Sequence, residues 1–338
     1  MTAATRILGI DTSCDETAVA VVEEGRRVLS ARLSSQIGLH APFGGVVPEI
    51  ASRRHLETLF GLLQEVLEES RSAGPPQAIA VTQKPGLIGA LLVGVSAAKA
   101  LAYAWRLPLV GVDHVHAHAY STIQDRDDVS FPLATLVVSG GHTSLFLMRS
   151  ALDLKLRGET VDDAAGEAFD KVASLLELGY PGGPAIDKAA RRGNPHAHSL
   201  PRGEVKGAPF DFSFSGLKTA VRYHLRGQDL SQPARVLEAS EVADLAASFQ
   251  EAVVEALLAR LLRLAGEEGA AGVAIGGGVA ANTRLRERAA ERAHQAGLPL
   301  YLSPRELATD NAVMVAGLGF HVLRERGPSG LDLEATPH

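Results

Sequence analysis

The sequence predicts an α/β protein built from two similar lobes, and three observations lead to that prediction. At 338 residues the chain is longer than a comfortable single compact domain. An apolar run, a turn of Ser, Thr or Gly and a second apolar run occur at residues 6–22 and again at 134–149. Short apolar strands are separated by longer helical stretches. The repeated pattern indicates two copies of one unit, each offering a turn to a shared cleft. We place the first lobe at residues 1–113 plus 310–338 and the second at 114–309, with an insertion around 191–210.

Composition narrows the class of protein. Hydrophobic residues make up 46% and charged residues 21%, as in ordinary soluble proteins. The net charge of −6 argues against a chain coated in nucleic acid, so an RNA partner needs a local basic patch or a helper subunit. The single Cys14 excludes a disulfide framework and indicates a reducing compartment. No basic stretch followed by an apolar run and a cleavage site opens the chain, so we expect a cytoplasmic protein.

The first half of the chain is expected to alternate strands with helices. Residues 6–22 predict strand, turn and strand, and residues 78–82 and 109–112 predict two short strands. A helix is expected over 48–70, with Pro48 at its first turn. The expected apolar side of that helix carries Ile50, Leu56, Leu59, Leu63 and Leu67. The segment from Leu87 to Trp105 is the most membrane-like, but its apolar part stops at Lys99, which is typical of a core helix.

The second half carries fewer regular signals. A helix is predicted over 160–179, with Glu167 and Lys171 as a surface pair. A second helix is predicted from Glu241 to Ala265, and a strand from Gly272 to Ile275. Between the two helices, residues 191–210 form a loop of Pro, Gly and basic residues. This loop is either a solvated insertion or the best RNA-facing segment of the chain. Its basic residues are Arg191, Arg192, His196, His198, Arg202 and Lys206. From Gly327 onward we expect a frayed tail.

A histidine-rich stretch at 111–120 is the clearest candidate for chemistry. If it is helical, His114 and His118 lie one turn apart on one face, where two imidazoles can bind one ion, and His116 points elsewhere. The bland alternative is a helix with capped or exposed histidines. Val115 stands where zinc proteases carry their general base. The third ligand must come from a distant segment.

Asp310 is the most credible third ligand. It precedes an apolar helix and follows Thr309. The alternative is that an acid near the start of a helix only complements the helix dipole, and the spacing alone does not choose between the two.

Glycines at 276–278, with Ala281, fit the dinucleotide pattern G-x-G-x-x-A after a strand and before a helix. No acid follows at the distance where the ribose would need one; Arg305 could serve an NADP phosphate, which remains a poor alternative. The glycine run still predicts that backbone amides at the start of a helix face an anionic or nucleotide ligand. A tight turn that needs Gly for packing is the competing explanation.

Other reactive side chains give weaker evidence of a catalytic role. Cys14 lies beside Asp15 and Glu16, which raise the pKa of a thiol, so we interpret it as structural. No Gly-x-Ser-x-Gly elbow surrounds Ser139 or Ser215, so a serine hydrolase is unsupported. In a turn, Asp15 and Glu16 could both reach a cleft as base or water-mediated metal holders, although most such pairs only form turns.

Eight short motifs occur along the chain: Thr-Ser-Cys-Asp15-Glu16, Gly111-Val-Asp-His114 with His118, Val138-Ser-Gly-Gly-His142-Thr, Gly166-Glu-Ala-Phe-Asp170-Lys, Tyr180-Pro-Gly-Gly183-Pro, Phe212-Ser-Phe-Ser-Gly-Leu-Lys218, Gly276-Gly-Gly-Val-Ala-Ala-Asn282 and Thr309-Asp310-Asn311. Taken together, these motifs resemble the TsaD family (the Kae/Qri group), the tRNA adenosine threonylcarbamoyltransferases formerly named O-sialoglycoprotein endopeptidases. The resemblance runs from about residue 6 to 320, in order and at family-like spacing.

The resemblance implies a fold and a set of site residues. The fold would be that of the sugar-kinase, actin and heat-shock-chaperone ATPase superfamily, with two ribonuclease-H-like lobes around a nucleotide cleft. It implies one metal ion, Fe2+ favoured and Zn2+ possible, at His114, His118 and Asp310. Asp15 and Glu16 are our candidates for a catalytic base. The resemblance places the nucleotide-like substrate at Val137, Val138, Ser139, Gly140, Gly141, Asp170, Gly183, Asp187 and Asn282.

The resemblance also implies a reaction and partners. A threonylcarbamoyl group would move from threonylcarbamoyl-AMP to the 6-amino group of the adenosine 3′ of the anticodon, in tRNAs reading codons that begin with A. The expected protein partners are the TsaB paralogue and the TsaE ATPase.

Three positions depart from the usual family pattern: Lys84 in a loop that is commonly Gly-Pro-Gly, Asp11 where some members have Glu, and Ala308 where Cys is frequent. None is a metal position. The rival functions are a sugar-kinase-like phosphotransferase and the old metalloprotease assignment, which Val115 weakens. A non-catalytic scaffold like the TsaB paralogue is a third rival, and the three metal-type ligands speak against it.

Overall fold

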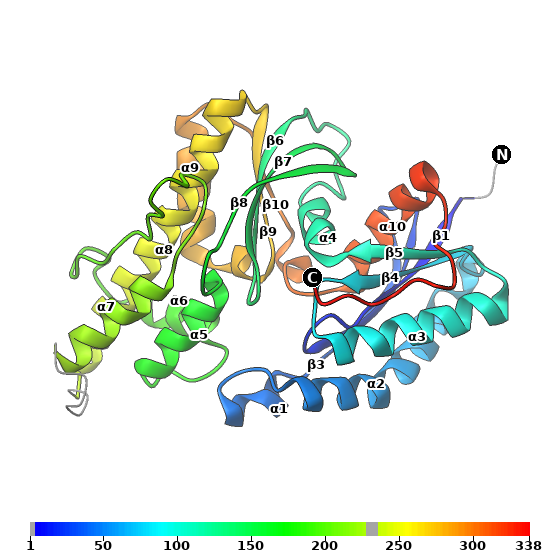
Figure 1. The fold of residues 1–338 in the computed structure, drawn as a ribbon, viewed down its shortest axis with the longest axis horizontal. Coiled ribbons are helices and arrows are strands. Elements are labelled where there is room, and N and C mark those ends of the chain that lie inside the picture. The colour runs from blue at the N-terminus through cyan, green and yellow to red at the C-terminus, as the bar shows by residue number, and fades with distance from the viewer. Residues whose placement is uncertain (1–3, 228–235) are drawn as a thin grey trace. The chain divides into compact units, whose positions relative to one another are not determined.

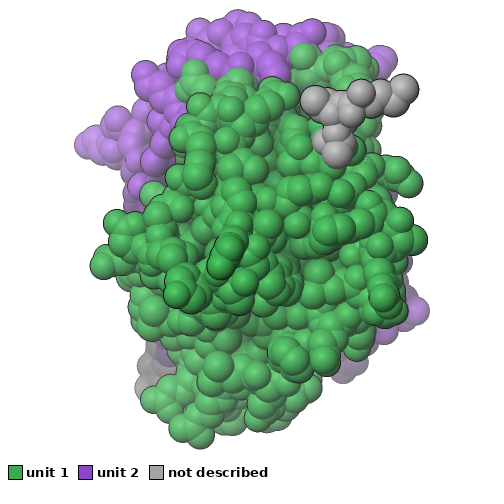
Figure 2. All heavy atoms as spheres, turned by 90° about the vertical axis from the view of Figure 1, so that its right-hand side faces the viewer, with its two compact units in different colours: residues 1–129, 150–153, 303–338 green, residues 130–149, 154–302 purple. Residues whose placement is uncertain are grey.

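The computed structural model describes residues 4–227 and 236–338 and divides into two compact units. Unit 1 comprises residues 1–129, 150–153 and 303–338, and unit 2 comprises residues 130–149 and 154–302. Figure 2 colours unit 1 green and unit 2 purple.

Unit 1 is built on a mixed sheet of five strands (Figure 1). The first three strands form an antiparallel meander, and the last two run parallel to the first. The sheet order is β3-β2-β1-β4-β5. The strands are β1 (Arg6–Asp11), β2 (Glu16–Glu23), β3 (Arg27–Ser35), β4 (Ala78–Lys84) and β5 (Leu109–Asp113).

Unit 2 repeats this topology. Its first strand is antiparallel to the second and parallel to the fourth, and its order is β8-β7-β6-β9-β10. The duplication predicted from the two similar turns is therefore confirmed at the level of the whole sheet. The strands are β6 (Leu133–Val138), β7 (Thr143–Ser150), β8 (Asp153–Glu159), β9 (Gly272–Gly276) and β10 (Leu300–Leu302).

Helices cover both faces of the unit 1 sheet, which explains why its central strands are apolar without interruption. Side chains alternate along β1: Leu8 and Ile10 pack in the core formed with α2 and α3, whereas Gly9 lies against α10. A Cβ on Gly9 would come within 2.4 Å of the Ala312 carbonyl oxygen, so glycine permits the close approach of α10. The unit 1 helices are α1 (Ile37–His40), α2 (Pro48–Glu69), α3 (Ile88–Trp105), α4 (His114–Ser121) and α10 (Ala312–Arg326), with short 3-10 turns at Ala41–Phe43, Arg71–Ala73 and Arg305–Leu307.

The core of unit 2 is the larger of the two hydrophobic clusters, and the long central helix α8 contributes many of its residues. Two aromatic pairs lie in it: Phe169 meets Phe249 edge to face, and Phe212 stacks on Phe214. The helices are α5 (Ala165–Leu175), α6 (Gly182–Ala190), α7 (Ser215–Arg226), α8 (Ala239–Glu268) and α9 (Thr283–Gln295), with a 3-10 turn at Gly278–Ala281.

The boundary between the units differs from the prediction. Residues 114–129, 150–153 and 303–309 belong to unit 1, although we had expected them in the second lobe. The reason is packing: α4 lies against α10, and the hydroxyls of Ser121 and Ser303 are 2.6 Å apart in the interior. The expected boundaries after 113 and before 310 therefore fall after 129 and before 303.

Helix α3 is the one described helix that is long and apolar enough to cross a membrane by length and composition. It packs on β4 and α2, with its inner face buried at Ala90, Leu91, Gly94, Val95, Ala98 and Ala102. Its outer face is apolar as well. Together with α2 it lines a groove of about 600 Å³ that exposes Leu56, Phe60 and Leu92. We call this surface the α2–α3 groove.

The chain after α10 is ordered against unit 1, contrary to the expected frayed tail. The Ser329 amide donates to the Leu109 carbonyl (2.7 Å), and the Thr336 amide donates to the Gln83 carbonyl (2.9 Å). The tail thereby covers β5, which is an edge strand of the sheet.

Candidate metal centre and substrate loops

Two metal-type ligands are positioned by the junction of β5 and α4. The strand ends at Asp113, whose carboxylate accepts from the His116 amide at 3.0 Å and so caps α4. The helix begins at His114, and its geometry places His118 one turn further on the same face. The two rings lie 4.6 Å apart between centroids and are both buried. The stretch is therefore helical as expected, with His114 and His118 buried on one face rather than exposed.

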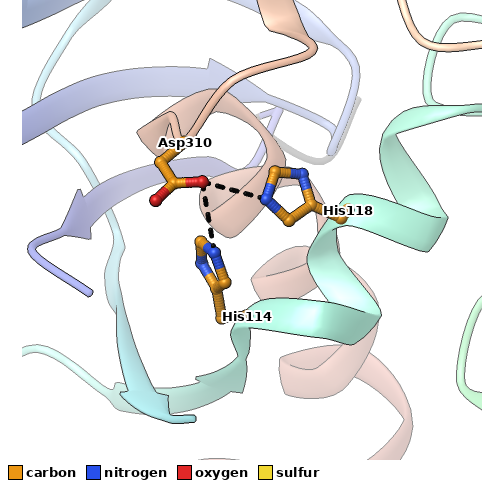
Figure 3. Close-up of side chains that lie close together, drawn as sticks. All are labelled: His114, His118 and Asp310. Atoms are coloured by element: carbon orange, nitrogen blue, oxygen red, sulfur yellow. Dashed lines mark hydrogen bonds and ion pairs between the residues drawn. The ribbon is translucent and has the colours of Figure 1, made fainter. Parts of the chain in front are cut away.

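The third ligand comes from the other end of unit 1. Asp310 Oδ1 lies 3.3 Å from His114 Nε2 and 3.1 Å from His118 Nε2 (Figure 3). Asp310 does not belong to the first turn of α10, because Asn311 is the N-cap and its side chain accepts from the Met314 amide. The dipole explanation for Asp310 thus loses its basis, and the carboxylate is free to face the two imidazoles.

These three residues fit a divalent cation. Their ligand atoms all lie within 4.8 Å of one another. Two atoms that bind the same ion at about 2.1 Å are about 3–3.5 Å apart, which matches the separations around Asp310 Oδ1. Two imidazoles and one carboxylate form a donor set that suits iron and zinc alike.

The surroundings of His118 and Asp310 favour the protonation states that bind a metal ion. Burial lowers the pKa of His118, which keeps its imidazole neutral. Burial would raise the pKa of Asp310, but His114 and His118 outweigh it and hold that pKa well below its usual value. Burial opposes a charge on His114, yet Asp310 and Asp11 raise its pKa well above the ordinary range.

Asp11 is a functional candidate that the sequence analysis noted only as a departure from a pattern. It ends β1, is fully buried, and places Oδ2 at 3.4 Å from His114 Nδ1. A carboxylate behind a histidine ligand fixes the orientation of the ring and the ring nitrogen that carries the proton. The available signal was an acid at the end of an apolar strand.

The turn that carries Asp15 and Glu16 is held by a buried histidine of α2. His55 Nε2 lies 3.0 Å from the Cys14 carbonyl oxygen, and His55 Nδ1 lies 2.8 Å from the Thr17 hydroxyl. Burial lowers the pKa of His55, so the ring is neutral, donating to Cys14 and accepting from Thr17. Hydrophobic periodicity had no means of detecting this contact.

Asp15 and Glu16 differ in their protonation. Burial, with smaller contributions from Asp310 and Asp15, raises the pKa of Glu16 to about 8. Burial and Asp310 also raise the pKa of Asp15. Glu16 is therefore protonated at neutral pH and is a poor base, which leaves Asp15 as the better of the two candidates. Burial also raises the pKa of Cys14, as expected of a structural thiol.

The loop after β6 offers open backbone in unit 2. Val137 and Val138 are completely buried residues at the end of β6. Ser139 closes the turn by accepting from the His142 amide at 3.1 Å. Gly140 and Gly141 are exposed, and a Cβ on either would have nothing within 4 Å. The turn can therefore present its backbone to an anion.

The other predicted substrate residues lie on neighbouring elements, and most of them already contact other protein groups. Asp170 accepts from the Gly182 amide at 2.6 Å, which ties α5 to the start of α6. Gly183 faces open space. Asp187 lies 3.5 Å from Arg191. Asn282 caps α9 and also donates to Gln250, so both ends of its side chain have protein partners.

Comparison with solved structures defines the class of fold. HypF from T. kodakarensis matches with a TM-score of 0.63 at 16% identity, over 95% of this chain and 48% of that one. A ROK family protein from Streptococcus pneumoniae matches with a TM-score of 0.54 at 14% identity, over 95% and 99%. The chain thus has the two-lobed fold of the actin-like ATPase and sugar-kinase superfamily.

The family is defined by sequence. The model of the TsaD family, described as tRNA N6-adenosine threonylcarbamoyltransferase, matches residues 27–317. A protein of that name from Anaeromyxobacter dehalogenans is 50% identical over 98% of both chains. One from Syntrophobacter fumaroxidans is 50% identical over 95% of both. The chain belongs to the TsaD family.

Proposed function

We propose that this chain transfers a threonylcarbamoyl group from threonylcarbamoyl-AMP to the 6-amino group of the adenosine 3′ of the anticodon, in tRNAs reading codons that begin with A. The observation that carries the proposal is near-full-length identity of 50% to proteins named for this transfer, in a chain whose three metal-type ligands converge.

The proposed enzyme depends on one divalent cation, Fe2+ by preference and Zn2+ as the alternative, bound by His114, His118 and Asp310. A cation bound there would supply Lewis acidity and a template for the substrate. Support comes from the donor set and its spacing, and from Asp11, whose carboxylate lies behind the His114 ring.

The proposed step forms a bond between the adenosine N6 and the carbamoyl carbon. The bond from that carbon to the phosphate oxygen breaks, and AMP leaves. The mixed anhydride is already activated, so no covalent enzyme intermediate is required. N6 must lose one proton, and we assign its acceptance to Asp15, since Glu16 is neutral at the same pH.

For the nucleotide part of the substrate we propose the open backbone at Gly140, Gly141 and Gly183. Amides at turns and helix starts bind phosphate well, and no side chain obstructs these three positions. Asp170, Asp187 and Asn282 would then shape this site chiefly by holding its helices.

The proposed partners are the TsaB paralogue and the TsaE ATPase, and the proposed location is the cytoplasm. The α2–α3 groove supports a protein partner, because Leu56, Phe60 and Leu92 expose apolar side chains next to one another, and contiguous exposed apolar side chains mark interaction sites. The proposed location is supported by the single Cys14, because a chain with one cysteine has no disulfide of its own.

The decisive experiment is reconstituted transfer. Unmodified tRNA, threonylcarbamoyl-AMP made from labelled threonine, this chain and its two partners are incubated, and label is followed into nucleosides by mass spectrometry. We expect label on adenosine with the wild type, its loss in His114→Ala, and its retention in His116→Ala, a matched control on the same helix that lies outside the ligand set.

Full activity of His114→Ala would contradict the proposed metal site. No label from the complete wild-type system would contradict the transferase itself. In that case, transfer of labelled phosphate from ATP to a small substrate would identify the fold-level rival, a sugar-kinase-like phosphotransferase, and peptide cleavage would identify the metalloprotease.

A further inference from the structure

Several cations of unit 2 form ion pairs with carboxylates of neighbouring elements. On α9, Arg284 binds Glu251, while Arg288 and Arg292 bind Glu255. Arg157 binds Glu268 in the same manner. Such pairs present little net charge to a partner.

The segment 186–226 has a large excess of basic over acidic residues. It contains eight Lys or Arg and three Asp or Glu, a net charge of +5 in a chain of net −6. Lys188, Arg192 and Arg222 are exposed, and within the described ranges no carboxylate forms an ion pair with them. Arg191 has only a long contact of 3.5 Å to Asp187.

These cations are brought onto one surface by a fixed segment. After α6, Gly193 packs on the backbone of Ala243 so closely that a Cβ would come within 2.0 Å of its carbonyl oxygen. The Asn194 amide donates to Asp244, and the His198 amide donates to Ser248, both on α8. The insertion predicted around 191–210 is therefore anchored at its start.

The anchored segment leads directly to α7. The rings of His198 and His224 meet edge to face at 4.3 Å. On the turn that carries His224, Arg222 and Tyr223 point away from the core, and Tyr223 is 46% exposed. We call the surface that carries Lys188, Arg192, residues 193–198, Arg222 and Tyr223 a strip, because the contact between His198 and His224 joins its two segments.

We propose that this strip, the α6–α7 surface, binds the phosphate backbone of the tRNA, with Tyr223 stacking on an unpaired base. Unpaired cations on a rigid frame attract phosphates, and exposed tyrosines stack on splayed bases. The proposal rests on the proposed function for the identity of the RNA. An acidic protein would need the cations but has no base to place on Tyr223, so RNA is favoured.

The test measures tRNA affinity by fluorescence anisotropy across a salt series, with this chain in its complex. The triple variant Lys188→Gln, Arg192→Gln, Arg222→Gln should bind at least tenfold more weakly at low salt, and the slope of log K against log salt should fall by about two to three. A control triple variant at exposed arginines of unit 1, Arg27→Gln, Arg71→Gln, Arg324→Gln, removes the same charge and should keep both values.

A second pair of variants tests the stacking. Tyr223→Leu should weaken binding at least fivefold with an unchanged salt slope, while Tyr103→Leu, at a tyrosine 76% exposed in unit 1, should not. Wild-type affinity and slope in the first triple variant would overturn the proposal. The proposal would also be overturned if the first triple variant lost a protein partner from the complex while its affinity for tRNA stayed unchanged. Transfer is assayed separately, so failure of the wild type to transfer bears on the proposed function alone.

Discussion

The glycines of unit 2 fall into two groups according to what a side chain would meet. A Cβ on Gly182 would lie 2.5 Å from the Asp170 Cα, whereas a Cβ on Gly183 would meet nothing within 4 Å. The first glycine is required for packing and the second is available to a ligand.

Alanine substitutions should separate these two roles. Gly182→Ala should cost about 1–3 kcal/mol in the free energy of unfolding, because backbone atoms must move. Gly183→Ala should leave stability unchanged or slightly raised, and should weaken binding of threonylcarbamoyl-AMP. Denaturant unfolding and calorimetric titration measure the two effects. Equal substrate affinity in Gly183→Ala and the wild type would remove Gly183 from the site.

Asp11→Asn should lower metal affinity about 10–100-fold, because the carboxylate behind a histidine ligand sets its orientation and basicity. Titration of Zn2+ or Fe2+ into metal-free protein gives the affinity without reference to activity. Asp113→Asn is the control, since asparagine also caps a helix. An Asp11→Asn protein that binds metal as tightly as the wild type would show that the contact is only packing.

Glu16 predicts a pH dependence of stability. Its pKa rises from 4.5 to about 8 on folding, so the folded state prefers the protonated form. Its contribution is complete below pH 4.5 and is lost as pH rises toward 8, by up to about 1.4 kcal/mol per pH unit. Glu16→Gln should therefore gain stability relative to the wild type between pH 5 and 8, measured with chelator present. A difference that is constant with pH would contradict the raised pKa.

At the scale of elements, α2 connects the interior to the 14–16 turn through His55. His55→Leu should leave the Cys14 carbonyl and the Thr17 hydroxyl without this partner and cost about 2–4 kcal/mol. Transfer should fall further than stability alone explains, because the turn carrying Asp15 loses its support. Urea unfolding and transfer rates at a temperature where both proteins are folded test this. Unaltered transfer by the folded variant would limit His55 to a structural role.

Helix α2 also shows where sequence reasoning works and where it stops. Apolar periodicity predicted a helix over 48–70, and the observed bounds are Pro48–Glu69. The same periodicity assigned Leu56 to the inner face, but Leu56 is 68% exposed and His55 is buried instead. A polar ring that finds two hydrogen-bond partners can occupy a core position, and an apolar side chain can face a partner. Neither outcome is visible in a hydrophobic pattern.

At the scale of the whole molecule, the repeated turn predicted a duplication, and the two sheets share one strand order. The placement of His114 and His118 on one face was predictable because the two residues follow helical spacing. The unit boundaries were not, since they depend on α4 packing against α10 rather than on any local composition.

The α2–α3 groove predicts separable effects on assembly. Phe60→Ser should leave the free energy of unfolding within about 0.5 kcal/mol, because the ring is 68% exposed, and should abolish association with the TsaB paralogue. Size-exclusion chromatography with that partner gives the answer, with Tyr103→Ser as the control outside the groove. A stable complex with Phe60→Ser would place the partner elsewhere.

The ordered tail has a practical consequence for anyone producing this protein. The Pro337 carbonyl accepts from the Gly86 amide at 3.4 Å, and the next amide, that of Leu87, donates to Ser13 at 2.9 Å. A purification tag fused after His338 would therefore lie next to residues 86–87, which are hydrogen-bonded to the turn that carries Asp15. Weak activity in a C-terminally tagged preparation would then reflect the tag, and untagged protein is the proper reference for every assay above.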